Sequence, residues 1–520
     1  MGLEKSGLSG PAARAVGARA LSILADWSVV EARQGQPAWE DLDRAVAAAM
    51  QDGMAPVLVL AHTPQWASLA TGADLARPEI SSRQPPRHVR DWERFVGLAA
   101  SRYRGRVRDW QVWTRLGLPA FRGTGGEYLQ LLQAAAARIR AVDPQARVVA
   151  ASPGGVDLGF IVRLAESAPG VFDAIAVPAA GMAPEAMLRP LGVLAGRLRD
   201  RGKPVWLEWA PEASLGGTRA RAEWTKMLLV AEATGVQRLV VADPDRNADP
   251  LRQAVSGLGA RWFAGYLARD PDVFVAAAGF PADAVLLAWA RAGERTLDLP
   301  AAPGLQAATV DGRPVTLEVR DGRVVARLSE IPLVITGVPV GLLEEARAAA
   351  VRAPWLPVPQ RDFGQSPEVF ARLGRSGEER GLYNAAYRSR PNGAVEVVEL
   401  DGGEAVRTAV GRGVVYVYFD VDDTFLFFSE GRVPLDVTVE VWGARAARSL
   451  GFNLLYDAAG GYRFTPWVWV DPGEGWRSYT IRLPDASFAN TWGYDFAINA
   501  AGNRAEDLTV RAVRVRKALP

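Results

Sequence analysis

The chain has 520 residues, of which 49% are hydrophobic and 23% charged, and its formal net charge at pH 7 is +2. These values are typical of folded globular proteins and exclude a disordered or fibrous chain. At about 100–200 residues per domain, the length predicts several domains, or one large barrel with smaller modules. The sequence has no cysteine and two histidines, His62 and His88, which excludes disulfide scaffolds and thiolate metal sites and argues against a multi-histidine metal site. We therefore expect neither a metal nor a cofactor.

The charges and the apolar runs also restrict the classes of partner that we expect the protein to bind. The 60 basic residues are matched by 58 acidic ones, and no long basic run could follow a phosphate backbone, so nucleic acid is not an expected partner. No run approaches the roughly 20 apolar residues that span a membrane. The first residues, MGLEKSGLSGP, lack the apolar core of a signal peptide. The localisation stays open between a protein that remains inside the cell and a mature or trimmed chain.

Residues 1–270 alternate short apolar runs with amphipathic segments such as 39–53 and 127–143. The runs that we predict as strands are 20–26, 56–61, 109–113, 147–152, 173–177, 203–208 and 237–242. Strands that are apolar on both faces and are separated by helices predict a parallel sheet. The number of such units and the lack of a glycine-rich phosphate loop favour a (β/α)8 TIM barrel over a doubly wound sheet. A closed barrel has eight strands, however, and the segment before residue 20 is too polar to supply the missing first one.

From residue 271 onward the pattern changes to alternating, strand-like runs with turn signals at 311–313 and 321–323. We predict a small β-sandwich domain over 271–340, a linker rich in Pro, Arg and Glu over 341–382, and a second all-β domain over 383–520. Many short strands at regular spacing favour a jelly-roll-like sandwich for this last domain.

In a TIM barrel, functional residues stand at the carboxyl-terminal ends of the strands. The residues at these positions are Asp26, Trp27, Glu31, His62, Trp66, Trp113, Thr114, Arg115, Ser152, Pro178, Glu208, Trp209, Glu212, Asp243 and Asp245. Tryptophans at four strand ends could form flat platforms for sugar rings, although rim packing explains any single one equally well. For the acids, capping of the following helix is the simpler interpretation. Glu208 is the exception, because the strand pattern leaves its direction ambiguous.

The stretch 27–68, which contains TPQWA at 63–67, resembles retaining glycoside hydrolases of clan A, particularly family 39 and neighbouring xylosidase- and cellulase-like barrels. The segment 102–150 is similar to that family's W-E-V-W-N-E-P-N strand and the helix after it. The resemblance covers most of residues 12–340. It implies a TIM barrel, a carbohydrate partner and an extracellular or cell-surface location. The substrate-binding residues that it implies are Trp27, His62, Trp66, Trp113, Thr114, Arg115 and Trp209.

The catalytic positions of that family are altered in this chain. Thr114 and Arg115 stand where the family has Asn and the acid/base Glu, and Pro178 stands where it has His. A gap-free match of 203–211 puts Trp209 at the nucleophile position, and a one-residue shift that restores Glu208 would turn the strand over. Retaining hydrolysis needs two carboxylates about 5–5.5 Å apart, and arginine cannot act as the acid because its pKa lies above ~12. We therefore expect lost or much reduced catalysis, with Glu208 as the one candidate catalytic residue.

Three functions remain open. The first is a degenerate glycosidase that binds a glycan or polysaccharide, with Arg115 facing an acidic sugar. The second is an active retaining glycosidase that uses Glu208 and a relocated acid/base. The third is a structural or assembly protein with a protein partner or self-association. The first predicts binding without turnover, the second predicts turnover that Glu208→Gln abolishes, and the third predicts neither.

The C-terminal segment 413–516 resembles the galactose-binding-like sandwiches that accompany many glycosidases, on the pieces 418–426, 437–443, 454–465, 475–490 and 494–499. Trp467 and Trp469 share one strand face and could form a sugar platform, but a place in the core between two sheets is the simpler interpretation. Asp420, Asp422 and Asp423 could ligate calcium, but we favour a solvated turn.

Overall fold

The computed structural model describes residues 19–518 except for 243, 260, 262, 268–271, 280–282, 292, 351–360, 386–394, 430–431 and 505, and the side chains of 244–245. The chain forms two compact units. The first extends to Pro357 and the second begins at Val358, with the short segments 157–159 and 268–271 grouped with the second. In the part of the chain that is described, no helix is long and apolar enough to cross a membrane.

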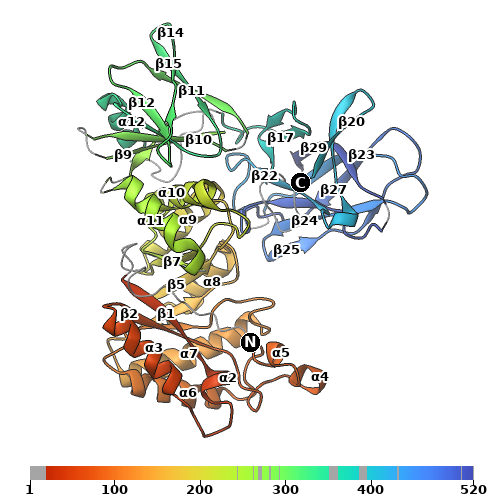
Figure 1. Cartoon of the computed structure of the whole chain (residues 1–520). Helices are drawn as coiled ribbons and strands as arrows, with labels where there is room; N and C mark the ends of the chain where they lie inside the picture. Colours follow the sequence, from red (N-terminus) through yellow and green to blue (C-terminus); the bar gives the residue numbers. More distant parts are fainter. Residues whose placement is uncertain are drawn as a thin grey trace. The chain divides into compact units, whose positions relative to one another are not determined.

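The first unit is built around seven parallel strands that pair strictly in chain order (Figure 1). They are β1 (Ala20–Asp26), β2 (Ala55–Ala61), β3 (Asp109–Val112), β4 (Arg147–Ala151), β5 (Ala174–Pro178), β6 (Val205–Trp209) and β7 (Arg238–Val241). The seven predicted strands are thus confirmed. No described strand pairs with the outer edges of β1 and β7. The described sheet is therefore a curled half-barrel, and not the closed eight-stranded ring that we expected.

Helices lie between the strands and pack on the sheet. They are α3 (Glu40–Gln51), α6 (Val89–Tyr103), α7 (Gly125–Val142), α8 (Leu158–Ser167), α9 (Pro184–Arg199), α10 (Gly217–Thr234) and α11 (Pro244–Leu258), with the single turns α2 (Trp27–Val30), α4 (Gly72–Leu75) and α5 (Pro78–Ser81). Helix α3 packs on β1 and β2, α7 on β3 and β4, and α9 on β6 (Figure 1). Helix α7 begins with a capping box, in which Thr124 and Glu127 each bind the other's backbone N–H.

The curl of the sheet is visible in contacts between strands that are not neighbours. Arg238 at the start of β7 lies 3.2 Å from Asp109 at the start of β3, and its guanidinium lies 3.9 Å from the ring centre of Trp206. Asp109 also pairs with Arg147 of β4 at 2.6 Å. Two strands that stand four places apart can touch only if the sheet curls around an interior. These side chains close that interior at the amino-terminal ends of the strands.

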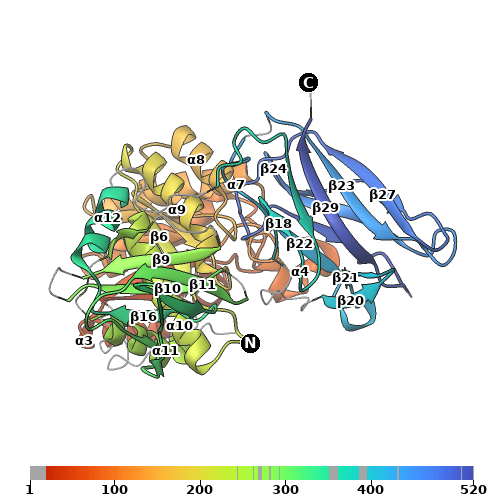
Figure 2. The ribbon, with the colours of Figure 1, turned by 90° about the horizontal axis from the view of Figure 1, so that it is seen from above.

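The rest of the first unit is antiparallel. Its strands are β8 (Phe263–Tyr266), β9 (Val273–Ala278), β10 (Val285–Ala290), β12 (Gln306–Thr309), β13 (Pro314–Val315) and β16 (Leu333–Thr336) in one sheet, and β11 (Arg295–Pro300), β14 (Glu318–Arg320) and β15 (Arg323–Leu328) in a second. Both sheets share one core with α12 (Val340–Ala350) (Figure 2). The predicted turn at 321–323 joins β14 to β15, with positive φ at Asp321 and Gly322.

A buried charged group connects this β part to the helices of the half-barrel. Glu185 of α9 accepts a hydrogen bond from Trp289 Nε1 of β10 at 2.8 Å. The same carboxylate lies 3.0 Å from Lys226 Nζ of α10, and the side chains of Lys226 and Glu185 are both buried. Because β8 begins at Phe263, the antiparallel sheet also starts earlier than the predicted boundary at 271.

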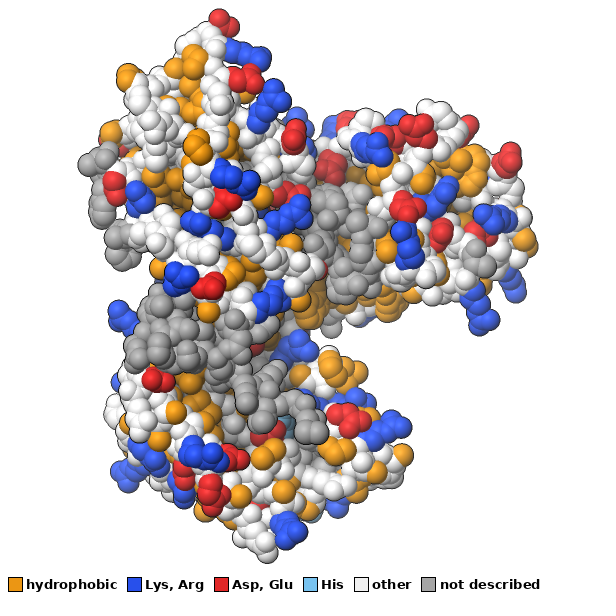
Figure 3. Space-filling model, in the orientation of Figure 1, with side chains coloured by type: hydrophobic (Ala, Val, Ile, Leu, Met, Phe, Trp, Pro, Cys, Tyr) orange, Lys and Arg blue, Asp and Glu red, His pale blue; other side chains and the backbone are white. Residues whose placement is uncertain are grey.

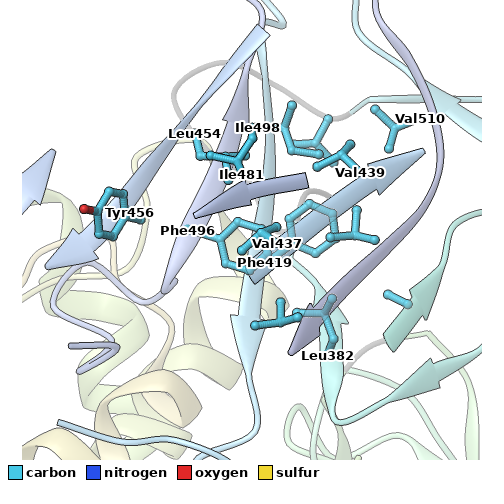
Figure 4. Close-up of a cluster of buried hydrophobic side chains, with 14 of the residues drawn as sticks. Leu382, Phe419, Val437, Val439, Leu454, Tyr456, Ile481, Phe496, Ile498 and Val510 are labelled. Carbon is cyan, nitrogen blue, oxygen red and sulfur yellow. The ribbon is translucent and has the colours of Figure 1, made fainter. Parts of the chain in front are cut away.

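The second unit consists of two antiparallel sheets around one core. The first sheet holds β17 (Glu368–Arg372), β18 (Glu379–Arg380), β20 (Glu396–Leu400), β21 (Gly403–Arg407), β23 (Leu435–Trp442), β27 (Trp476–Leu483) and β29 (Thr509–Lys517). The second holds β19 (Leu382–Asn384), β22 (Tyr416–Val421), β24 (Gly451–Ala458), β25 (Gly461–Phe464), β26 (Val468–Trp469) and β28 (Phe496–Asn499). Figure 4 shows Val437 and Val439 of the first sheet beside Phe419 and Phe496 of the second, whose rings stack at 5.0 Å.

The segment 341–382, which we predicted as a linker, contains folded elements. The segment contains α12, β17 and β18, and Val369, Ala371 and Leu373 are buried in the core of the second unit. The segment is rich in Pro, Arg and Glu, but it also contains a short alternation of buried and exposed residues. This alternation is enough for a strand in the middle of a sheet.

Candidate functional site

The site lies where the parallel strands end, and its first member is Asp26, the last residue of β1. One carboxylate oxygen of Asp26 accepts hydrogen bonds from the backbone N–H of Ser28 at 2.9 Å and from the Ser28 hydroxyl at 2.5 Å. The other oxygen lies 2.7 Å from Nδ1 of His62, which directly follows β2. The neighbouring ends of β1 and β2 thus hold an Asp–His pair.

His62 connects Asp26 to an arginine. The ring is buried, and its second nitrogen, Nε2, contacts the guanidinium of Arg83. Because a guanidinium only donates hydrogen bonds, Nε2 accepts, and the ring proton resides on Nδ1 and points to Asp26. His62 is therefore a neutral imidazole between a carboxylate and a guanidinium.

The charge state of Asp26 follows from these contacts. Burial acts to raise its pKa, but the hydrogen bonds from His62 and Ser28 outweigh burial and hold the pKa below its usual value. Asp26 is therefore ionised at neutral pH and has no proton to give to a leaving group.

The structure determines the direction of Glu208, which the sequence left ambiguous. Trp206 belongs to the interior cluster of the curled sheet, and Glu208 lies two residues further along β6, on the same face. Trp209 faces the other way. Its ring is fully buried, packs edge-on against Trp224 of α10 at 4.7 Å, and donates from Nε1 to the Met182 carbonyl. Of the two nucleophile candidates, Glu208 is thus the one that faces the interior.

Two further predicted sugar platforms are also packed away. Trp27 is fully buried, stacks on Phe95 at 5.4 Å and donates a hydrogen bond to Glu31. Trp113 is fully buried and donates from Nε1 to the carbonyl of Ala120. Together with Trp209 these rings hold helices and loops to the sheet, so the structure corrects their expected role as open platforms.

Trp66 is the tryptophan of this set that remains partly exposed. It lies edge-on to Trp27 at 5.7 Å and donates from Nε1 to the backbone carbonyl of Glu31 at 2.9 Å. Glu31 is itself buried and pairs with Arg94 at 2.5 Å. Glu31 is therefore a structural acid that fixes Trp27 and Trp66, and not a rim acid.

Thr114 and Arg115 follow β3, and both are partly exposed. Gln111, the interior polar residue of β3, holds this turn by donating to the carbonyls of Trp113 at 3.0 Å and Thr114 at 3.4 Å. Arg115 forms neither an ion pair nor a hydrogen bond with any residue in the described ranges. The expected acid/base position therefore presents a cation that has no counterion of its own.

The other rim residues have local roles or lie outside the description. The Ser152 hydroxyl is buried and donates to the carbonyl of Ala176, and Glu212 accepts from Ser214. The side chains of Asp243 and Asp245 are outside the described residues. In the part of the chain that can be described, no group of three His or acidic side chains could hold a metal ion.

Sequence analysis missed Arg83 and Gln111. Gln111 carried a signal, because it is polar in a strand whose alternate residues face the interior. Arg83 lies in a long loop after β2 and is brought to His62 only by the fold, so no local pattern could have revealed it.

In the second unit, Trp467 and Trp469 meet edge-on at 6.1 Å, and Trp469 is 46% exposed. Trp469 is thus not a core residue. Asp422 accepts hydrogen bonds from the Tyr383 hydroxyl at 2.9 Å and from the N–H of Thr424, which is the behaviour of a turn-capping acid. Figure 3 shows acidic and basic side chains interspersed over the visible face, and not gathered in one basic patch.

Comparisons with known proteins show likeness in fold. No family model and no curated protein matches the chain. A family 39 glycoside hydrolase from the gut symbiont Bacteroides cellulosilyticus WH2 matches with 17% identity over 63% of this chain and 77% of that one (TM-score 0.49). A monomeric beta-xylosidase from Caulobacter crescentus CB15 matches with 15% identity over 64% and 92% (TM-score 0.43). A BuGH86 structure in complex with neoagarooctaose matches with 11% identity over 97% and 91% (TM-score 0.43). These neighbours are glycoside hydrolases, and the likeness concerns the fold alone.

Proposed function

We propose that the first unit binds a glycan at the carboxyl-terminal ends of its parallel strands and hydrolyses glycosidic bonds slowly or not at all. The observation that carries this proposal is the side-chain set at these ends. Asp26, His62, Arg83 and Gln111 are held by mutual or backbone hydrogen bonds, and the partly exposed Trp66 follows β2, the strand that ends next to His62. Oriented polar groups next to an aromatic ring suit a polyhydroxylated ligand.

The same residues argue against efficient hydrolysis. Retaining and inverting mechanisms both need a protonated carboxyl group near the leaving oxygen and a second carboxylate. Of the two inward acids at described strand ends, Asp26 is kept ionised by His62 and Ser28. Arg115 stands where an acid/base residue is expected and cannot release a proton at working pH. Loss of general acid help alone costs about 10²–10⁴ in rate.

An active retaining glycosidase is the second candidate, and the inward direction of Glu208 favours it. The test is hydrolysis of aryl glycosides with activated leaving groups, because these substrates need little help from an acid. Wild-type protein is compared with Glu208→Gln, and Glu212→Gln serves as the control because Glu212 is a neighbouring acid with a local partner. Binding of a polysaccharide panel is measured on the same proteins by titration calorimetry.

We expect at least one glycan to bind and no aryl glycoside to be turned over. Turnover that is lost in Glu208→Gln and kept in Glu212→Gln would establish the active glycosidase instead. If the protein shows neither binding nor turnover, the structural or assembly function remains, with a protein partner or self-association.

A further inference from the structure

We infer that the glycan carries an anionic group, a uronic acid carboxylate or a sulfate ester, and that Arg83 and Arg115 contact it. This inference rests on the proposed function, since it names the chemical class of the ligand for the same site. Four observations support it.

The first observation is position. Strands β2 and β3 are neighbours in the sheet. Arg83 reaches the end of β2 through His62, and Arg115 follows β3. The rings of His62 and Trp113 lie 6.2 Å apart, and the N–H of Arg122 donates to the carbonyl of Arg83 at 2.9 Å. The two arginines therefore come from segments that pack against each other.

The second observation is charge. Arg115 has no partner within the described chain, and the contact of Arg83 is a neutral imidazole. Other arginines of the same unit have carboxylate partners, such as Arg94 with Glu31 and Arg138 with Glu93. Arg83 and Arg115 are both partly buried, so water compensates them less well than it does an exposed arginine. A partly desolvated cation without a counterion is stabilised when an anion binds.

The third observation is donor capacity. A guanidinium has five N–H donors, and Arg83 uses one nitrogen for His62. The remaining donors can bind two oxygens of a carboxylate or sulfate in the paired geometry that arginine favours.

The fourth observation is the distribution of the acids. Glu208 belongs to β6, three places from β3 in the order of the sheet, and Asp26 of β1 lies on the opposite side of the His62 ring from Arg83. A ligand with charge along its whole length would meet these carboxylates. The site therefore suits a sugar chain with one anionic unit at β2 and β3, and disfavours a nucleic acid backbone.

The test is calorimetric titration of the whole protein with three oligosaccharides of equal length: an oligouronate, a sulfated galactan fragment and a neutral xylo-oligosaccharide. The variants are Arg115→Gln and Arg115→Lys. The control is Arg122→Gln, because Arg122 lies in the same loop and is exposed. Circular dichroism confirms that each variant is folded.

We expect one anionic oligosaccharide to bind more tightly than the neutral one, and its dissociation constant to rise with salt. Arg115→Gln should weaken that binding about 10- to 100-fold, the usual range for a lost charge-assisted hydrogen bond. Arg115→Lys should retain part of the affinity, and Arg122→Gln nearly all of it. The oligosaccharide that binds more tightly identifies the group as carboxylate or sulfate.

Two other outcomes are distinguishable. If the neutral oligosaccharide binds as well as the charged ones and Arg115→Gln changes none of them, the inference is overturned while the proposed function stands. If no oligosaccharide binds, the proposed function itself fails. A loss of neutral and anionic binding to the same extent in Arg115→Gln would also overturn the inference, since it would assign Arg115 a general role.

Discussion

The tryptophans at the strand ends have two different roles: some pack inside the fold, and one remains available for contact with a ligand. Trp27, Trp113 and Trp209 are fully buried, and each donates its Nε1 proton to a protein oxygen. Trp66 has a similar hydrogen bond but keeps part of its surface exposed. A tryptophan at a strand end therefore identifies a ligand contact only when the fold leaves its ring uncovered.

This division leads to a stability prediction. Trp209→Ala should lower the free energy of unfolding by about 3–5 kcal/mol, because it leaves a cavity beneath α10. Trp469→Ala, at a ring that is 46% exposed, should change stability by less than about 1 kcal/mol. Urea denaturation of both variants measures the difference. Equal effects of the two substitutions would contradict the packing that we describe for β6 and α10.

At the scale of elements, the parallel strands and a barrel-like curl were predictable, but the direction of side chains at the strand ends was not. Runs such as PVLVLA and RVVAAS are apolar on both faces, which is sufficient to predict a covered parallel strand. The direction of Glu208 was not predictable, because alternation along a strand gives two faces without saying which one is inside. The ion pair between Arg238 of β7 and Asp109 of β3 supplies that information, because it crosses the interior beside Trp206, and it exists only in the folded chain.

We expect the ion pairs at the strand starts to contribute to the stability of the whole half-barrel. Asp109 pairs with Arg147 and Arg238 and is buried. Asp109→Ala leaves two guanidiniums without a carboxylate and should destabilise the first unit by about 3 kcal/mol. Asp249→Ala, which removes the exposed pair with Arg252 on α11, should cost less than about 1 kcal/mol. Thermal unfolding of the two variants checks this, and comparable losses would show that Asp109 does not hold the curl.

The whole molecule consists of two compact units with separate cores. Because each unit has its own core, each should unfold cooperatively by itself. The division near residue 358 was only partly predictable, because the composition of 341–382 indicated a linker while its apolar residues belong to α12 and to the second core.

The separate unfolding of the two units can be tested by changing the pH, because a buried acid in the second unit has a shifted pKa. Burial raises the pKa of Asp457 to about 6, while hydrogen bonds from the N–H groups of Ala489 and Thr491 partly oppose the rise. The stabilisation from the protonated form is complete below 3.8, the ordinary pKa of aspartate, and is lost as the pH rises through a pKa of about 6. Between pH 5 and pH 7.5 the second unit should therefore lose on the order of 1 kcal/mol of stability from this group.

Calorimetry at the two pH values should show two transitions. We expect the transition of the second unit to move down at pH 7.5 and to move less in Asp457→Asn. Asp436→Asn is the control, because Asp436 is a partly exposed acid of the same unit. A single transition in the wild-type protein, or an unchanged pH response in Asp457→Asn, would contradict this description.

The ion pairs at the strand starts limit how far a ligand can reach into the half-barrel. Glu208 stands two residues above Trp206 on β6, which corresponds to roughly 7 Å of strand. Arg238 and Asp109 lie immediately around that ring. These side chains occupy the interior at the strand starts, so we expect that a polysaccharide does not thread along the strands from one end of the sheet to the other. Such a protein would engage a chain tip or a side branch, or a stretch lying across the opening, and would move between binding positions by release and recapture.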